Sequence, residues 1–352
     1  MTWKLSRFRT GGTVEVRSKE EILATLDQRG SLDRLPFMPE MLQYCGQRFR
    51  VGAVAHKTRD TARQTWTNRR LDTTVHLAGL RCDGSAHGGC QAECNLFWKD
   101  AWLKPVAKTG LEGAKRVEAT NTRASGCTQA QLLNNTQLSL GGEGDEPIYS
   151  CQATQMYEAT QALAWWDVRQ YVFDVTAGNH SAGRVFRVLF LASLRWLRNR
   201  ILRHMPWAHR FFKPLNERMH QWLTGRASPS LNAQIPDGQP TPTGRLNLKP
   251  GEYVRIKAQL DIEQTVDKKG MNRGLGFDLE EMAPYCGRVV TVHKAVTQII
   301  HEPTGKMLHM KQPCIMLEGV VCKAEYARCR LNCPREIPSY WRELWLDRVE
   351  DR

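Results

Sequence analysis

The sequence lacks any long apolar run. Hydrophobic residues make up 41% of its 352 residues, yet no stretch reaches the ~18–20 consecutive apolar residues of a membrane-spanning helix. The opening residues, MTWKLSRFRTGG, have neither the apolar core nor the small-residue cleavage site of a secretory signal. We therefore expect a chain without a membrane span, located in the cytoplasm.

Acidic residues are scarce as well, with 36 Asp and Glu against 50 Lys and Arg. The net charge of +14 favours an acidic partner, such as nucleic acid, anionic lipid or an acidic protein. Familiar catalytic motifs are also missing. The segment GGEGDE at 141–146 has no lysine to bind a phosphate, and no metalloprotease, kinase or hydrolase signature is present. Whether the chain is an enzyme therefore stays open.

Cysteine, in contrast, is abundant, with 11 residues. In a reducing compartment, clustered cysteines bind metal or do chemistry more often than they form disulfides. Three of them, Cys82, Cys90 and Cys94, lie within LRCDGSAHGGCQAECNLFWKDAWL at 80–103. Metal ligation is the favoured interpretation, and buried unreactive thiols or disulfide pairs are its alternatives.

The second half of the chain repeats the order of the first. VEVRSKEEILATLDQRG from Val14 aligns with VRIKAQLDIEQTVDKKG from Val254, and Tyr-Cys-Gly recurs at 44–46 and 285–287. LAGLRCDGSAHGGCQAECNLFWKDAWLKPV then parallels LEGVVCKAEYARCRLNCPREIPSYWRELWLDRV. Because an internal repeat indicates copies of one structural unit, we infer a tandem duplication of roughly residues 12–106 and 248–349.

Each half is rich in β-branched runs, such as GEYVRIKAQL, GRVVTVHKAVTQII and KQPCIMLEGVVC, which predict strands. EPTGK at 302–306 predicts a turn. A G-x-x-V-R-[VI] strand before a G-x-V strand resembles the small barrels of KOW-type domains and of the nitrile hydratase beta subunit. The resemblance implies a small barrel of about five strands and no activity. FWKDAWLKPV and YWRELWLDRV each predict a short helix with two tryptophans on one face.

The middle of the chain is not repeated and reads as mainly helical. SCQATQMYEATQALAWWDVRQYVFDVTAGN predicts a helix that ends near Gly178. HSAGRVFRVLFLASLRWLRNRILRHMPW predicts a second, basic amphipathic helix over 184–203. Its arginines share a sector of about 80°, and they are Arg184, Arg187, Arg195 and Arg198. The adjoining face carries Phe186, Phe190, Leu194, Leu197 and Ile201. This helix either docks on an acidic or membrane partner or packs on the barrels.

These observations predict an α+β fold with two duplicated small β-barrel domains, each with a cysteine-rich loop and a short helix. The first barrel and its cysteine motif span 1–106, and the second span 248–352. The mainly helical middle region at 107–225 and a Pro- and Gly-rich linker at 226–247 join them.

Each half offers four equivalent cysteines. They are Cys45, Cys82, Cys90 and Cys94, and Cys286, Cys322, Cys329 and Cys333. Four thiolates complete the shell of a zinc ion and equally bind an iron–sulfur cluster. A compact three-cysteine run with a distant fourth favours the cluster, because C-x7-C is not a zinc knuckle.

The fourth ligand of each set is the open point. Tyr-Cys-Gly could instead be a tight turn with a buried Cys45 or Cys286, and His87 is an alternative to Cys45 in the first set. The second half has no histidine at the matching place. CDGSAH at 82–87 is similar to the signature of the CDGSH iron–sulfur proteins, but Ala86 is inserted before the histidine, so we carry nothing over from that family.

The sequence therefore predicts a metal-binding protein with two equivalent four-cysteine sites, two iron–sulfur clusters per chain rather than zinc. It would act in electron transfer or as the redox component of a biosynthetic reaction, with an acidic protein or a redox partner. Two alternative functions remain. One is a zinc-stabilised basic module that binds nucleic acid or an acidic protein, and the other is an enzyme whose metal is purely structural. The oligomeric state is left open.

Overall fold

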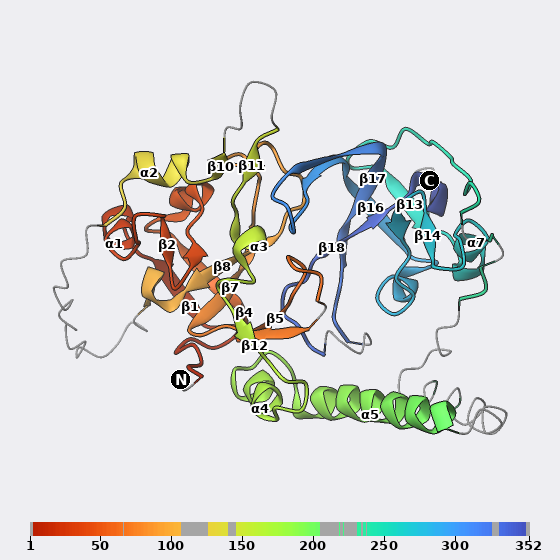
Figure 1. Ribbon diagram of the computed structural model, residues 1–352, viewed down its shortest axis with the longest axis horizontal. Coiled ribbons are helices and arrows are strands. Elements are labelled where there is room, and N and C mark those ends of the chain that lie inside the picture. The colour runs from red at the N-terminus through yellow and green to blue at the C-terminus, as the bar shows by residue number, and fades with distance from the viewer. Residues whose placement is uncertain are drawn as a thin grey trace. The chain divides into compact units, whose positions relative to one another are not determined.

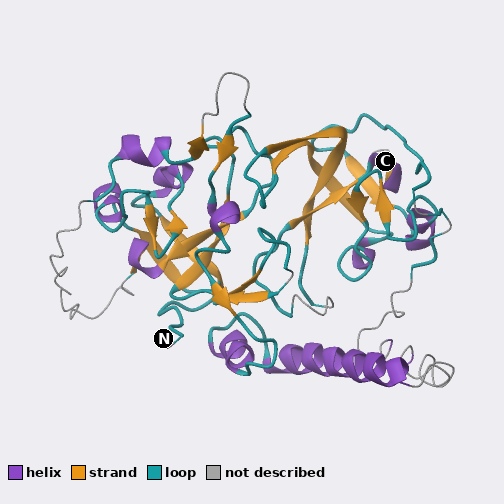
Figure 2. Ribbon diagram, in the orientation of Figure 1, coloured by secondary structure: helices purple, strands orange, loops and turns teal. Residues whose placement is uncertain are grey.

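The computed structural model describes residues 3–65, 67–106, 126–139, 146–204, 218, 221, 231–233, 235–236, 238–325 and 331–349. The chain divides into two compact units (Figure 1). The first unit comprises Met1–Asn179 and Gln298–His309, and the second comprises His180–Thr297 and Met310–Arg352. Strands in antiparallel sheets dominate both units, with few helices (Figure 2). The α+β prediction is thus right in its coarse form, while the duplicated barrels stay a prediction.

The first unit is built on a five-stranded antiparallel sheet with the order β8-β7-β4-β1-β9. Its strands are β1 (Thr13–Val16), β4 (Arg48–Val54), β7 (Thr74–Arg81), β8 (Asn95–Lys99) and β9 (Leu103–Pro105). The register pairs Val54 with Val75 and Val14 with Phe49. Because successive residues of a strand face opposite sides, Val14 and Val16 both reach the core and are fully buried.

Short helices close the ends of this sheet. α1 (Lys19–Leu23) begins at a capping box, in which the Ser18 hydroxyl accepts the Glu21 amide and the Glu21 carboxylate accepts the Ser18 amide. A 3-10 turn at Pro39–Tyr44 follows the hairpin β2 (Ser31–Leu32) and β3 (Leu35–Pro36). This turn is important for the site, because it carries Glu40 into the interior.

The second unit contains a five-stranded sheet with the order β18-β17-β16-β13-β19, but the end of β16 from Gln298 and the start of β17 up to His309 belong to the first unit. Its strands are β13 (Tyr253–Ile256), β16 (Val289–Ile300), β17 (Met307–Val321), β18 (Pro338–Trp341) and β19 (Leu346–Arg348). Smaller elements are α7 (Gln259–Glu263), β14 (Met271–Asn272), β15 (Leu275–Gly276) and a 3-10 turn at Ala283–Tyr285. In both sheets the first strand, β1 or β13, pairs with the last strand, β9 or β19. The turn predicted at 302–306 lies between β16 and β17, as expected.

The short helices predicted after the cysteine clusters are wrong. Trp98 lies in strand β8 and Trp102 ends a three-residue 3-10 turn, Asp100–Trp102. In the second unit, Trp341 ends β18 and Glu343–Trp345 is the corresponding turn. A strand forms here instead of a helix because the backbone around Trp98 pairs with β7, where Trp98 lies opposite Val75. One tight turn then suffices to send both tryptophans into the same core.

The middle region mixes short helices and strands. Its elements are α2 (Gln129–Asn134), β10 (Gln137–Ser139), β11 (Ile148–Tyr149), α3 (Gln152–Gln155), β12 (Gln161–Ala162) and α4 (Arg169–Thr176). The single helix predicted over 150–179 is therefore broken. Its break follows from Thr160, whose hydroxyl donates back to the carbonyl of Met156, and from β12, which pairs with β6 (Asn68–Arg70) beside β5 (Lys57–Arg59). The expected end near Gly178 is right, since this glycine has a φ of +80°.

The basic amphipathic helix is present as α5 (Ala182–His204). Side chains are described for most of it, but those of Arg195 and Arg198 lie outside the described part. No helix among the described residues combines the length and the apolar character needed to cross a membrane. The first residues of the predicted linker, 226–230, also lie outside the described residues.

Candidate metal centre

The loop between β7 and β8 folds back tightly on itself. The Cys82 amide donates to the carbonyl oxygen of Cys94 at 2.9 Å, which joins the two ends of the loop. Inside it, the amides of His87 and Gly89 donate to the carbonyl oxygen of Gly84 at 3.1 and 3.0 Å. Gly84 has a φ of +73°, and a Cβ atom there would lie 2.0 Å from the carbonyl oxygen of Cys90. Only glycine allows this close approach.

The loop brings three cysteines to one cavity. Cys82, Cys90 and Cys94 line it, and a fourth cysteine, Cys151, joins them. Cys151 stands just before α3, a helix that packs on the neighbouring β3. The fold therefore gathers four thiols from two segments that lie about 60 residues apart in the sequence.

Burial governs the electrostatics of two of these thiols. Burial raises the pKa of Cys82, and the charges of Glu40, Cys94 and Cys151 raise it further. Burial also raises the pKa of Cys151 to about 12, with the charges of Cys94, Cys90 and Glu302 adding to the effect. Without a cation, these buried thiols stay protonated, because desolvation disfavours thiolates. A bound metal would supply the positive charge that thiolates need in such surroundings.

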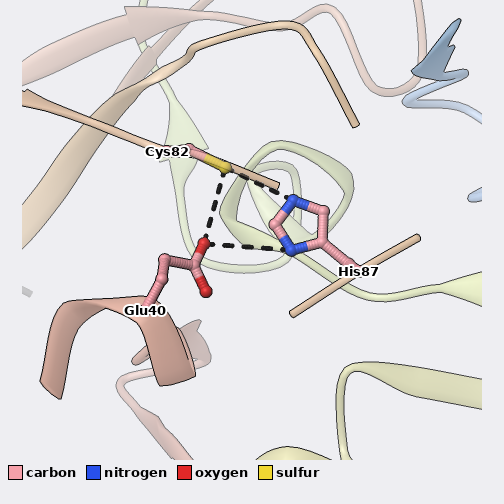
Figure 3. Close-up of side chains that lie close together, drawn as sticks. All are labelled: Glu40, Cys82 and His87. Atoms are coloured by element: carbon pink, nitrogen blue, oxygen red, sulfur yellow. Dashed lines mark hydrogen bonds and ion pairs between the residues drawn. The ribbon is translucent and has the colours of Figure 1, made fainter. Parts of the chain in front are cut away.

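Glu40 and His87 form a buried group with Cys82 (Figure 3). The sulfur of Cys82 lies 3.3 Å from Nε2 of His87 and 3.5 Å from Oε1 of Glu40. Nδ1 of His87 lies 3.8 Å from the same Glu40 oxygen. Burial raises the pKa of Glu40 to about 7, and burial lowers the pKa of His87 to about 4.

Both side chains keep an unused polar atom. Within the described structure, neither Oε2 of Glu40 nor Nδ1 of His87 has a hydrogen-bond partner. Leaving a buried polar atom without a partner costs about 1–3 kcal/mol, so an orphaned pair beside a cysteine is the kind of place where proteins bind ions. The donor set, one sulfur, one imidazole nitrogen and one carboxylate oxygen, suits zinc.

The segment from Gln298 to Ile300 braces the loop from outside. The Ile300 amide donates to the sulfur of Cys90 at 3.3 Å. The side-chain amide of Gln298 donates to the carbonyl oxygens of Gly88 and Gly89, each at 3.0 Å. The Gln91 amide in turn donates to the carbonyl oxygen of Gln298 at 3.1 Å. Hydrogen bonds of this kind fix ligand orientation and tune the electronic properties of metal-bound sulfur.

The structure does not bring Cys45 to the cavity. This cysteine ends the 3-10 turn at Pro39–Tyr44, whereas Glu40 lies in its first turn, and Cys45 does not line the cavity. Burial is the main cause that raises the pKa of Cys45, and the charge of Glu20 on α1 raises it further. Cys286 has the matching environment in the second unit, where burial and then the charge of Glu263 on α7 raise its pKa to about 12. Tyr-Cys-Gly therefore behaves as a turn with a half-buried cysteine.

Two residues of the site were not predicted. Cys151 has no counterpart in the second half, so comparing the halves excludes it, and only the fold reveals it. Glu40 did leave a signal. Because Met41 aligns with Met282, Glu40 aligns with Glu281, and both carboxylates are buried. A buried acidic residue at the matching position of both halves indicates a structural or functional role for that position.

The second cysteine set is arranged differently. The Cys322 amide donates to the carbonyl oxygen of Ile337 at 2.8 Å, so Ile337 stands where Cys94 stands in the first unit. Cys333 comes four residues earlier in the sequence, and Cys329 lies outside the described residues. Glu281 accepts the amides of Lys323 and Ala324, each at 3.0 Å. The two sets are thus not built alike at these positions.

No protein-family model matches the chain, and no curated protein sequence matches it. Sulfur donors suit zinc or an iron–sulfur cluster, since hard cations such as Mg²⁺ and Ca²⁺ prefer oxygen ligands.

Proposed function

We propose that the first unit is an iron–sulfur protein domain, with Cys82, Cys90, Cys94 and Cys151 as the cluster ligands. One observation carries the proposal, namely that these four thiols line a single buried cavity. Four cysteine thiolates are the usual ligand set of [2Fe–2S] and [4Fe–4S] clusters. The proposal keeps three of the cysteines expected from the sequence and replaces Cys45 by Cys151.

The surroundings of the four thiols suit a redox centre. Met38, Leu96 and Ile300 form apolar walls of the cavity, which would keep water from the cluster. The Ile300 amide would stabilise the thiolate of Cys90. A cluster bound here would supply one-electron redox chemistry, and the chain would act in electron transfer or as a redox component of a biosynthetic reaction. The net charge of +14 favours an acidic redox partner.

A zinc site is the second candidate, favoured by a different observation. The ligand atoms of Glu40, Cys82 and His87 all lie within 4.8 Å of one another, which is close enough to share one ion. In this case the metal would be structural, and the basic surface of the chain would bind nucleic acid or an acidic protein. The two candidates differ in their ligands, because only the first requires Cys90, Cys94 and Cys151.

The test is metal and sulfide analysis of protein purified without oxygen, together with the visible spectrum. We expect a brown protein with about four iron and four sulfide per chain, the content of one [4Fe–4S] cluster. Cys151→Ser should abolish the colour, and Cys45→Ser, the matched control, should retain it. A colourless protein that binds about one zinc, lost in His87→Ala and kept in Cys151→Ser, would replace the cluster by the zinc site.

We propose in addition that the two halves are copies of one small barrel-like unit. The equal strand order of the two five-stranded sheets supports this, as does the matching position of Cys45 and Cys286 beside α1 and α7. A second cluster at Cys286, Cys322, Cys329 and Cys333 stays a prediction. The register at Ile337 argues against its being equivalent to the first.

A further inference from the structure

Helix α5 lies against the second unit through its arginine side. The Arg184 guanidinium donates to the carbonyl oxygen of Lys323 at 3.3 Å, and that of Arg187 forms an ion pair of 2.5 Å with Glu325. Three aliphatic residues on the same half of the helix are buried, and they are Val185, Val188 and Leu191. The first turns of α5 thus use their arginines and their small aliphatic residues to hold the helix on the protein.

The opposite side of α5 exposes large apolar side chains. Phe186 is 70% exposed, Phe190 37% and Leu197 47%. At 100° per residue these three lie within a sector of about 40°, on the side away from Val188. The rings of Phe186 and Phe190 stack on each other, with centroids 6.0 Å apart. We call Phe186, Phe190 and Leu197 the outer stripe.

An ordinary surface helix buries its largest apolar residues, whereas α5 buries smaller aliphatic residues and leaves two phenylalanines exposed. Single exposed apolar residues need no explanation, but a row of three on the outward line of one helix does. Their exposure costs free energy that a partner surface would recover.

The charge of the helix selects the partner. α5 has no acidic residue in 23. Arg200, Arg203 and His204 are exposed at its C-terminal end, and the Arg200 guanidinium lies 5.4 Å from the ring centre of Trp196, itself 40% exposed. Phosphate groups attract these cations, and an interface between headgroups and acyl chains also accepts the outer stripe. Nucleic acid would match the arginines but would leave two phenylalanines and a leucine unused.

We propose that α5 is a membrane-docking helix that lies flat on an anionic lipid surface, with the outer stripe in the headgroup region. Arg200 and Arg203 would contact lipid phosphates, while Arg184 and Arg187 keep the helix attached to the protein. This surface is independent of the metal centre, because none of its residues lines the cysteine cavity.

Vesicle flotation of the full chain tests the proposal. Vesicles of phosphatidylcholine alone are compared with vesicles that contain one third phosphatidylglycerol. We expect flotation with the anionic vesicles only. The double variant Phe186→Ser/Phe190→Ser should bind about tenfold more weakly, because two aromatic side chains no longer insert. The control is Leu260→Ser, which removes an exposed leucine, 62% exposed, from α7, and it should bind like the unchanged protein.

Three outcomes would overturn the proposal. One is the absence of flotation with anionic vesicles. Another is equal binding by the double variant and the unchanged protein, which would show that net charge alone drives the association. The third is release of the protein from anionic vesicles by single-stranded RNA, to the same extent for the double variant and the unchanged protein. This result would assign the arginines to nucleic acid. Circular dichroism and metal content of each variant confirm that it is folded.

Discussion

Cys82 and Cys94 are joined by a backbone hydrogen bond of 2.9 Å, from the amide of the first to the carbonyl oxygen of the second. This bond closes the cysteine loop at its base and makes the two residues neighbours across β7 and β8. The corresponding bond of the second unit joins Cys322 to Ile337, at 2.8 Å. The position of Cys94, a proposed ligand in the first unit, is thus taken by an apolar residue in the second.

This difference predicts unequal roles for two cysteines that the sequence aligns. Cys94→Ser should remove the metal of the first unit, because one of its four thiols is lost, whereas Cys333→Ser should leave the metal content unchanged. Iron, zinc and sulfide analysis of both variants measures the effect. If each substitution instead removes about half of the metal, two equivalent sites exist and the register at Ile337 does not prevent the second.

Gly84 should be indispensable to the loop for a steric reason. Gly84 and Gly79 have φ values of +73° and +79°, so alanine at either position meets a similar backbone penalty of about 1–2 kcal/mol. Only at Gly84 would the new Cβ atom also meet the carbonyl oxygen of Cys90, at 2.0 Å; at Gly79 nothing lies within 4 Å. We therefore expect Gly84→Ala to lose its metal and Gly79→Ala to keep it.

Urea unfolding and metal analysis of the two glycine variants separate the two effects. A moderate loss of stability in both, with metal lost only in Gly84→Ala, is the expected pattern. Equal metal content in the two variants would mean that the loop can shift to accept a side chain, and that the fold of the loop does not fix the position of Cys90.

The buried Glu40 and His87 predict two opposite pH dependences in the metal-free protein. Burial raises the pKa of Glu40 from 4.5 to about 7, so between these values the folded chain holds a proton that the unfolded chain has lost. The free energy of unfolding therefore falls as pH rises through this window. Burial lowers the pKa of His87 from 6.5 to about 4, so there the unfolded chain holds the extra proton, and the free energy of unfolding rises with pH.

In the unchanged protein the two contributions nearly cancel, and single variants should separate them. Relative to the unchanged protein, Glu40→Gln should gain stability from about pH 4.5 to pH 7, by about 3 kcal/mol at most. His87→Gln should lose stability relative to it as pH rises from about 4 to 6.5. Urea titrations at four pH values measure both differences. Parallel stability curves for all three proteins would show that neither group is buried in an uncharged form.

The sequence predicts much of the local structure and part of the site. β-Branched runs place β13, β16 and β17 correctly, and the 3.6-residue periodicity predicts α5. Periodicity reveals two faces of a helix but not which one meets the protein, so the outward position of Phe186 and Phe190 could not be foreseen. The tryptophan segments were predicted as helices because their tryptophans are spaced i, i+4. The same spacing also fits a strand that runs into a tight turn, and this is what the structure contains.

The site shows the same division between local and long-range information. Spacing alone brings Cys82, Cys90 and Cys94 together, since a short loop cannot separate them. Cys151 reaches the cavity only because α3, which follows it, packs on β3. The sequence has no local signal for a contact between segments so far apart. Glu40 is intermediate, because its alignment with Glu281 was available but a single carboxylate does not indicate where it points.

Gln298 should control how firmly the loop holds a metal. Its side-chain amide donates to the carbonyl oxygens of Gly88 and Gly89, and its carbonyl oxygen accepts the amide of Gln91. These residues lie on both sides of Cys90. Gln298→Ala removes the two side-chain bonds and leaves the two bonds that the Gln298 backbone makes to Gln91. Since each net hydrogen bond contributes about 1 kcal/mol, we expect metal release to a chelator to become about tenfold faster or more, with little change in the amount bound at the start.

The control for this prediction is Gln28→Ala, an exposed glutamine of the same unit away from the loop. It should release metal at the unchanged rate. If the bound centre is a cluster, Gln298→Ala should also shift its reduction potential, because the loop residues that hydrogen-bond near the sulfur of Cys90 gain freedom. An unchanged release rate together with an unchanged potential would show that Ile300, whose amide contacts the sulfur directly, positions Cys90 without help from Gln298.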